Sequence, residues 1–331
     1  MTTKEKVLRM LLEQKMTTLS GTAMAEEIGV SRNAVWKVIQ DLQAYGYTID
    51  SIPGRGYQLV DYTDQVDPVL IEYLLTDAST FKVSYHPEVS STNDLARRDL
   101  LDFPDQNTLV IAGKQSSGRG RRGRVFYSDL SHGLYMSLGI RPHTDDFKEI
   151  PIYTLLTAAA CLQAFDPYIE DELQVKWVND LFYQGRKVAG ILSEMVTHLE
   201  NHDVPGVVIG IGINLAGQFS KAGQEIQNVA GTIFGEEIPE SFNVNEFIVH
   251  FLNYFNTYQD QLPQKAFLEI YKERLLGLNQ EIYYQIGQEK ETGIIRGIND
   301  DGHLLIEDDQ RQIKALYGQE IHFSSSQFLD K

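Results

Sequence analysis

The sequence predicts an α+β protein of three parts, and three observations carry that prediction. Capped helices with 3.6-residue periodicity fill roughly the first 45 residues, and strands alternate with helices from about residue 68 to about 262. After Gly277 the pattern changes to short strands separated by turns. We therefore expect a winged helix-turn-helix domain over 1–62, a central domain with a mixed β-sheet over 68–276, and a small β-barrel over 277–325.

Composition and charge set the N-terminal part apart from the remainder. The chain has 331 residues, one cysteine and a formal net charge of −17. The single thiol, Cys161, excludes an internal disulfide, and we find no signal peptide and no apolar run of about 18 residues, so we expect a cytoplasmic protein without a membrane segment. Residues 1–60 carry +1 and the remainder carries −18, which indicates a separate module with its own partner.

The N-terminal module reads as three helices followed by a two-stranded wing. Gly29 should end the second helix, Ser31 should cap the third, and Pro53-Gly54-Arg55 should form the tip of the wing. Two short helices, a tight turn and a capped third helix are typical of a helix-turn-helix. The expected ranges are 4–13, 23–28 and 32–45 for the helices, and 48–52 and 56–60 for the strands.

Polar side chains at the start and on the exposed face of the third helix favour DNA as the partner. A recognition helix reads base edges and phosphates from this face, and an arginine at the wing tip suits a phosphate or the minor groove. The residues predicted to bind DNA are Ser31, Arg32, Asn33, Lys37 and Arg55. The alternative is a winged helix that binds another protein.

The central and C-terminal domains are expected after a polar linker at 61–67. Asn93 or a neighbour should cap the first central helix. The expected central strands are 81–86, 107–112, 133–140, 175–177, 181–183, 188–196 and 206–215. The expected helices are 90–99, 152–165, 247–261 and 266–275. The expected C-terminal strands are 281–286, 293–298, 304–306, 312–316 and 320–323.

Residues Gly118–Arg124 read Gly-Arg-Gly-Arg-Arg-Gly-Arg in an otherwise acidic chain. Glycine permits close approach of the backbone to a ligand, and arginine supplies planar donors suited to phosphate and carboxylate. An RNA-binding tract or a solvated turn would have the same composition. The predicted strands 107–112 and 133–140 frame the segment, which favours a loop that covers an anionic ligand.

Three further clusters carry polar or glycine-rich chemistry. Ser90-Ser91-Thr92-Asn93 precedes a helix, where hydroxyls cap the helix or present hydrogen bonds to a small ligand. Lys176–Leu181 runs into Gly185–Leu192, a pair of segments that would also suit a hairpin with a charged tip. The glycines of Gly210–Leu215 would permit a ligand to approach the backbone. We find no zinc spacing, no Ser-His-Asp set and no P-loop.

Together these clusters resemble the biotin protein ligases in order and spacing over most of residues 81–325. With the winged helix, the whole chain resembles the bifunctional bacterial form, which is both biotin operon repressor and biotin–[acetyl-CoA-carboxylase] ligase. The resemblance implies a biotin/lipoate ligase-like central fold and an SH3-like C-terminal barrel. The sequence departs from the family at Val178, where proline is usual, and at Phe126, which stands near the usual tryptophan and keeps an aromatic face for adenine.

The resemblance also implies a two-step reaction and a role for each motif. Biotin and ATP, with Mg²⁺, would give biotinyl-5′-AMP, and a lysine of the biotin carboxyl carrier protein would then receive the biotin. The implied catalytic residues are Lys187, Asp180 and Arg121. The implied biotin-binding residues are Ser91, Thr92, Asn93, Gln115, Arg119, Gly120, Arg121 and Lys187. The implied ATP- and adenylate-binding residues are Arg121, Arg124, Phe126, Lys176, Asn179 and Asn214. Metal ligands are not identified.

The resemblance to the operon repressor implies that biotinyl-5′-AMP acts as corepressor and that a homodimer binds a two-fold symmetric operator. Two other classes stay open on the residues alone. A lipoate-type ligase would share the central fold, and a ligand-sensing regulator without catalysis would share the winged helix and the ligand domain.

Overall fold

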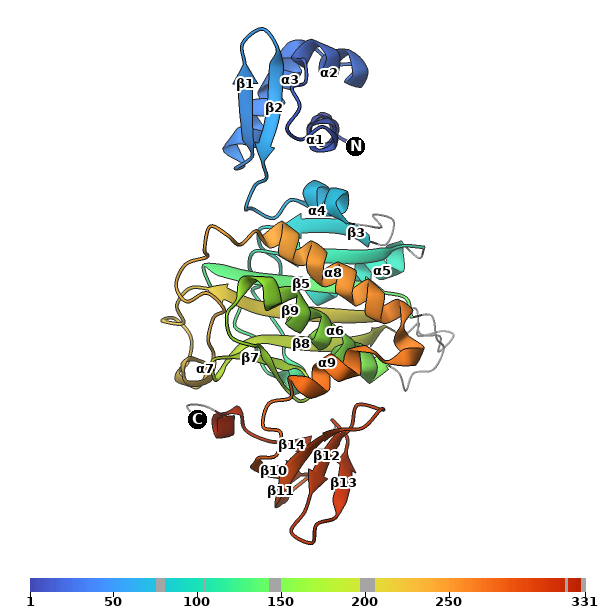
Figure 1. Ribbon diagram of the computed structural model, residues 1–331, viewed down its shortest axis with the longest axis vertical. Coiled ribbons are helices and arrows are strands. Elements are labelled where there is room, and N and C mark those ends of the chain that lie inside the picture. The colour runs from blue at the N-terminus through green and yellow to red at the C-terminus, as the bar shows by residue number, and fades with distance from the viewer. Residues whose placement is uncertain (76–80, 104, 143–149, 197–205, 319–320, 329–331) are drawn as a thin grey trace. The chain divides into compact units, whose positions relative to one another are not determined.

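The computed structural model describes residues 1–75, 81–103, 105–142, 150–196, 206–318 and 321–328. The chain forms two compact units (Figure 1). The first contains Met1–Tyr85 and Glu240–His250, and the second contains His86–Pro239 and Phe251–Lys331.

The first unit confirms the predicted helix-turn-helix. The side chains of Ser20 and Ser31 accept hydrogen bonds from Ala23 N and Ala34 N at the starts of the second and third helices. Gly29 ends the second helix with φ of 80°, a left-handed conformation that suits glycine. The elements are α1 (Thr3–Glu13), α2 (Gly21–Ile28), α3 (Arg32–Ala44), β1 (Thr48–Ile52), β2 (Gly56–Asp61), α4 (Pro68–Leu74) and β3 (Phe81–His86), of which α4 was not predicted.

The wing is an antiparallel pair, β1 with β2, joined to the rest of the unit by one further bridge. Tyr57 of β2 pairs with Leu19 just before α2. A Cβ at Gly56 would lie 1.9 Å from the Leu19 carbonyl oxygen, so the backbones meet only because position 56 is glycine.

The segment 61–67, expected to be a linker, lies within the first unit and is held by hydrogen bonds. Thr63 is buried, and its hydroxyl donates to the Tyr45 carbonyl oxygen at 2.7 Å. Asn245, at the start of α8 (Val244–Asp260), donates from Nδ2 to the carbonyl oxygens of Thr63 and Gln65.

The second unit is built on a sheet in the order β4-β5-β9-β8-β7-β6, and each neighbouring pair among these strands is antiparallel. The strands are β4 (Asn107–Ala112), β5 (His132–Ile140), β6 (Gln174–Lys176), β7 (Asp180–Tyr183), β8 (Arg186–Val196) and β9 (Gly206–Ala216). The helices and turns of this part are α5 (Thr92–Asp102), η1 (Arg121–Gly123), α6 (Ile150–Phe165), η3 (Asp166–Tyr168), α7 (Gln224–Val229), η4 (Leu262–Gln264) and α9 (Phe267–Glu273).

Strand register divides the residues of this sheet between two faces. On one face, Ser137 of β5 is opposite Gly210 of β9, and Gly210 is opposite Leu192 of β8. The next residue of β8, Ser193, lies on the other face, where its hydroxyl is 2.8 Å from that of Thr154 on α6. Figure 1 shows α6 and α9 in front of the sheet. Helix α6 therefore covers one face and leaves the other to the site described below.

The C-terminal part confirms the predicted small β domain. Its five strands form an antiparallel sheet in the order β13-β12-β11-β10-β14. Ile282, Tyr284, Ile295 and Ile306 are buried in its core. The strands are β10 (Glu281–Ile286), β11 (Glu289–Ile298), β12 (Leu304–Glu307), β13 (Ile313–Leu316) and β14 (Ile321–His322), followed by η5 (Ser325–Phe328); residue 320 of the last predicted strand lies outside the described residues. Within the described part of the chain, no helix is both long and apolar enough to cross a membrane.

Candidate active site

One cavity of about 730 Å³ in the second unit gathers every residue that the sequence analysis assigned to biotin, nucleotide or catalysis. These fourteen residues are spread over more than 120 positions of the chain. They are Ser91, Thr92, Asn93, Gln115, Arg119, Gly120, Arg121, Arg124, Phe126, Lys176, Asn179, Asp180, Lys187 and Asn214.

The arginine loop is a narrow hairpin held by its own backbone. Gly120 N donates to the Arg124 carbonyl oxygen at 2.7 Å, and Phe126 N donates to that of Gly118 at 3.0 Å. A Cβ at Gly118 would lie 2.5 Å from Ser128 Oγ and 2.7 Å from the Phe126 carbonyl oxygen, so this glycine is needed for the close approach. The loop is thus ordered around a glycine at its base, with arginines at its tip.

Two loop arginines donate to the C-terminal segment. Arg121 donates to Asn179 Oδ1 at 3.2 Å and to the Gly318 carbonyl oxygen at 2.9 Å, and Arg122 donates to that of Ile321 at 3.1 Å. Burial, and then the charge of Arg122, lowers the pKa of the Arg121 guanidinium. Both arginines line the cavity, and a guanidinium there suits an anionic ligand.

Arg119 has a different partner. It makes two hydrogen bonds to the Asp94 carboxylate, at 3.0 and 2.5 Å, and these raise the pKa of Arg119. The Arg119 guanidinium also lies 3.8 Å from the Glu194 carboxylate. A ligand that used the Arg119 side chain would therefore compete with two carboxylates.

The Phe126 ring lies close to two glycines of the sheet. Gly190 and Gly212 are opposite each other on β8 and β9. A Cβ at Gly212 would lie 2.4 Å from the Phe126 ring, and one at Gly190 would lie 3.1 Å from it. A Cβ at Gly210 would lie 2.2 Å from Asn93 Oδ1. Glycine is needed at these positions for the close approach of Asn93 and Phe126, and the same glycines line the cavity. The interpretation that the glycines of β9 permit a ligand to approach the backbone stays a prediction.

Lys187 and Asp180 form an ion pair of 2.7 Å between β8 and β7. The neighbouring Asn179 donates from Nδ2 to the Ile191 carbonyl oxygen at 2.9 Å. This contact leaves Asn179 Oδ1 as the acceptor for Arg121. The lysine, the carboxylate and the arginine thus meet around one turn between β6 and β7.

Lys176 is buried and contacts the C-terminal segment. Its Nζ donates to the Phe323 carbonyl oxygen and to Ser325 Oγ, both at 2.9 Å, and lies 4.7 Å from the centroid of the Phe323 ring. Burial lowers the pKa of the Lys176 ammonium to about 8. Its side chain anchors part of the cavity wall, which is formed here by Gly318, Ile321, Phe323, Ser324 and Ser325.

The sequence analysis missed this wall because it lies about 147 positions from Lys176 along the chain. A short apolar and serine-rich segment after a small barrel has no catalytic signature. Only the tertiary contact between the barrel and the sheet reveals its role.

The cluster at the start of α5 forms a network around Gln115. Gln115 Oε1 lies 2.8 Å from Thr92 N and 3.1 Å from Thr92 Oγ1. Ser91 occupies the N-cap position, but no side-chain hydrogen bond caps the helix, so the prediction that Asn93 or a neighbour caps it was wrong. Asn93 instead donates from Nδ2 to Glu194 Oε2 at 2.7 Å. The polar side chains at the start of this helix therefore form hydrogen bonds around the pocket and do not cap the helix.

Asn214 is buried, and only one of its two polar side-chain atoms has a hydrogen-bond partner among the described residues. Its Nδ2 donates to the Gly231 carbonyl oxygen at 3.1 Å, whereas its Oδ1 finds no hydrogen-bond partner among the described residues. Since a buried acceptor without a partner is costly, this oxygen suits a donor on a ligand in the cavity.

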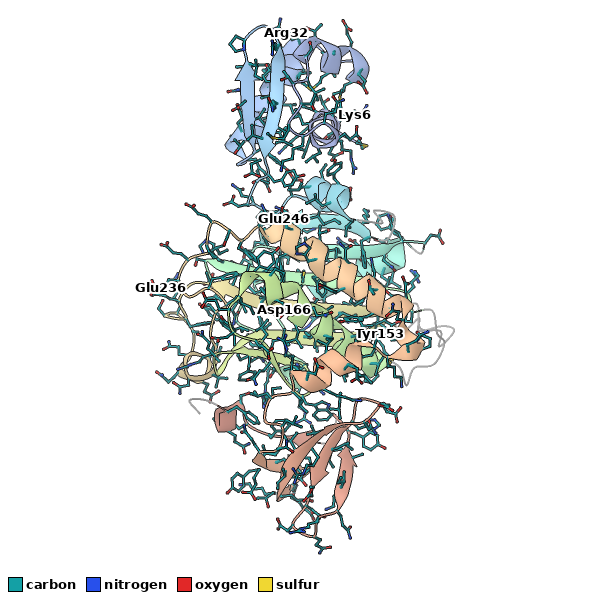
Figure 2. All side chains as sticks on the ribbon, viewed as in Figure 1. Lys6, Arg32, Tyr153, Asp166, Glu236 and Glu246 are labelled. Carbon is teal, nitrogen blue, oxygen red and sulfur yellow. The ribbon has the colours of Figure 1, made fainter. Side chains whose placement is uncertain are left out.

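The predicted DNA-binding residues are all exposed on the first unit. Ser31, Arg32, Asn33 and Lys37 are exposed on α3 or at its cap, and Arg55 is exposed at the wing tip. Figure 2 shows Arg32 among the side chains of this unit. Trp36 is 51% exposed on the same helix and was not predicted as a site residue.

Comparisons with known proteins agree with this architecture. Residues 85–214 match the biotin/lipoate A/B protein ligase family, and residues 3–58 match an HTH domain family. The biotin protein ligase from Aquifex aeolicus, solved in complex with biotin and ATP, is 26% identical, with a TM-score of 0.57 over 73% of this chain and 99% of that chain.

Two curated relatives match along nearly the whole chain. The bifunctional ligase/repressor BirA of Escherichia coli is 29% identical, over 93% of this chain and 94% of that protein. The bifunctional ligase/repressor BirA of Bacillus subtilis is 31% identical, over 92% of this chain and 93% of that protein. With this identity over both the helix-turn-helix and the ligase domain, the chain belongs to the family of bifunctional BirA ligase/repressors.

Proposed function

We propose that this protein activates biotin with ATP to biotinyl-5′-AMP, transfers the biotin to a lysine of the biotin carboxyl carrier protein of acetyl-CoA carboxylase, and represses biotin genes. The observation that carries the proposal is the convergence of the fourteen predicted residues on one cavity. The bound biotin and ATP of the similar Aquifex aeolicus ligase support both substrates.

In the first step, the biotin carboxylate attacks the α-phosphorus of ATP and pyrophosphate leaves. Negative charge then builds on the phosphoryl oxygens, and fixed donors in a partly dry site stabilise it. Lys187 lies between the two reacting groups in this proposal, and Asp180 holds its ammonium in place at 2.7 Å. Arg121 and Arg124 line the same cavity and supply further positive charge.

The remaining residues divide between the two ends of the adenylate. Phe126 offers its ring to the adenine, and the Asn214 and Asn179 amides contact the nucleotide side. Lys176 supports this side through Phe323 and Ser325.

Biotin is held at the other end of the cavity. Its head binds among Ser91, Thr92, Asn93 and Gln115, which surround the start of α5. Arg119 and Gly120 close over the head from the loop.

Mg²⁺ would enter with the nucleotide and would neutralise phosphate charge. The carboxylates of Asp180 and Glu225 line the cavity, and one or two carboxylates with substrate phosphates are the usual Mg²⁺ ligands in such sites. Clusters of three or more His, Cys, Asp or Glu side chains that could hold a metal are absent from the described residues.

In the second step, the lysine amine of the carrier attacks the mixed anhydride and AMP leaves. An amine is nucleophilic only when neutral, so a base must accept its proton. Asp180 takes this role in the proposal, because it lies in the cavity beside Lys187.

The repressor function uses the exposed face of α3 and the wing. The acidic remainder of the chain repels DNA, so binding depends on Arg32, Lys37 and Arg55. Operators usually present two half-sites to a symmetric dimer. We therefore propose a homodimer through the central sheet, with biotinyl-5′-AMP as corepressor and with repression lifted when carrier protein consumes the adenylate.

Release of pyrophosphate from ATP by the purified protein tests the proposal. We expect release that depends on biotin and that neither lipoate nor octanoate supports. Release with lipoate alone would indicate a lipoate ligase, and no release with any acid would indicate a ligand-sensing regulator.

A further inference from the structure

We infer that Ser137 and Glu194 are positioning residues that orient the biotin pocket through one chain of hydrogen bonds. The chain runs from Thr92 through Ser137 and Asn93 to the Glu194 carboxylate. The inference rests on the proposed function and assigns it two residues that do not themselves line the cavity.

The chain is continuous and short at every link. Ser137, on the site face of β5, is completely buried. Its Oγ lies 2.7 Å from Thr92 Oγ1 and 2.6 Å from Asn93 Oδ1. Asn93 Nδ2 then lies 2.7 Å from Glu194 Oε2 on β8.

The donors and acceptors in this chain follow from the groups that can only accept. A carboxylate oxygen only accepts, so the Asn93 NH₂ group faces Glu194 and Asn93 Oδ1 faces Ser137. An amide oxygen also only accepts, so the Ser137 hydroxyl is the donor to Asn93 Oδ1. The same hydroxyl is the donor in the 2.7 Å contact with Thr92 Oγ1.

The Thr92 hydroxyl donates its own hydrogen to Gln115 Oε1 at 3.1 Å, and the same oxygen accepts the backbone N–H of Thr92 at 2.8 Å. With its hydrogen directed into the protein, the Thr92 hydroxyl presents only lone pairs to the cavity that it lines. Thr92 is thereby fixed as an acceptor.

The charge at the end of the chain strengthens this polarity. Glu194 lies 3.4 Å from the Arg97 guanidinium and 3.8 Å from that of Arg119. Hydrogen bonds that end on a carboxylate are short, and linked bonds polarise one another. The position of Asn93 requires glycine at position 210, because a Cβ there would lie 2.2 Å from Asn93 Oδ1.

An oriented acceptor selects a particular ligand head. The bicyclic head of biotin is a cyclic urea that offers two N–H donors. The dithiolane of lipoate offers none, so it would leave the Thr92 oxygen unpaired. Sites built to pair a substrate N–H or O–H reject analogues that lack it far more strongly than apolar pockets do. This chain of hydrogen bonds therefore favours biotin over lipoate, although ligases for the two acids would share one fold.

Substitution of Ser137 tests the inference in the full-length protein. For Ser137→Ala we expect a KM for biotin about ten-fold higher, because buried acceptors lose their donor. We expect the KM for ATP and kcat to stay within about two-fold. Ser193→Ala is the matched control, since it removes a hydroxyl from the opposite face of the same sheet.

Two variants of Glu194 provide an independent test. Glu194→Gln keeps an oxygen that accepts from Asn93, whereas Glu194→Ala removes it, so the KM for biotin should rise more in the alanine variant. Preference for biotin over lipoate, as a ratio of kcat/KM, should fall in the same order. This pair decides the question even when Ser137→Ala does not fold.

The outcomes separate the inference from the proposed function. Wild-type protein that does not adenylate biotin would overturn the proposed function. An active wild type whose biotin KM is unchanged in Ser137→Ala and Glu194→Ala would overturn the inference alone. Equal rises in the KM values for biotin and ATP would do the same, since they would indicate general damage to the fold.

Discussion

Replacement of Lys176 by methionine should change how the stability of the second unit depends on pH. Lys176 is 8% exposed, and burial lowers the pKa of its ammonium to about 8 from the ordinary value of 10.5. Methionine has a similar length and no charge. The variant therefore removes the titration while it keeps most of the packing around Phe323.

The sign and the size follow from proton linkage. Between pH 8 and 10.5 the unfolded chain holds a proton at position 176 that the folded protein has released, so the free energy of unfolding rises with pH in this window. A difference of about 2.5 pKa units corresponds to about 3 kcal/mol over the whole window. Between pH 7 and 9 the expected gain of wild type relative to Lys176→Met is about 1 kcal/mol.

Urea unfolding at pH 7 and pH 9 measures this difference. Trp177 is buried beside Lys176, and in a Trp36→Phe background its fluorescence reports the second unit alone. Lys314→Met, which removes an exposed lysine from β13, is the control. The reasoning would be refuted if the free energy of unfolding of wild type, minus that of Lys176→Met, were the same at both pH values or lower at pH 9.

Three further variants test the proposed roles. Lys187→Ala should slow adenylate formation roughly 100-fold or more, because a lost donor at a developing oxyanion costs about 3 kcal/mol; single-turnover adenylation within about five-fold of wild type would contradict this role. Arg121→Gly removes the donors to Asn179 and Gly318, so the adenylate should leave faster and modify lysines of unrelated proteins; unchanged retention in a chase would count against it. Arg32→Ala should weaken operator binding about ten-fold and leave ligation intact, and Arg98→Ala, at an exposed arginine, is the control. Gel shift and biotinylation assays on one preparation measure both activities. Loss of ligation in Arg32→Ala would disprove the separate roles of the two domains.

Local sequence signals predicted the first unit well because caps and turns act over a few residues. Ser31 and Gly29 set the helix ends as expected. The strands of the second unit were also predicted to within a few positions, since buried strands such as 107–112 are apolar and bounded by polar turns.

The parts that sequence reasoning missed depend on contacts between distant segments. Ser137 is one polar residue in an apolar strand, and its partners lie 44 and 45 positions away. A glycine indicates a close approach but not the group that approaches, so the contacts of Asn93 with Gly210 and of Phe126 with Gly212 could not be predicted. Short helix α4 gave too little periodicity to be detected.

The most direct test of the central claim is whether the cavity makes and keeps biotinyl-5′-AMP. The protein is mixed with biotin and ATP labelled at the α-phosphate, without carrier, and is then passed through a desalting column. We predict about one labelled adenylate per protein chain, which carrier protein releases as AMP while its lysine becomes biotinylated. No retained adenylate, or retained adenylate that carrier protein cannot discharge, would contradict the account.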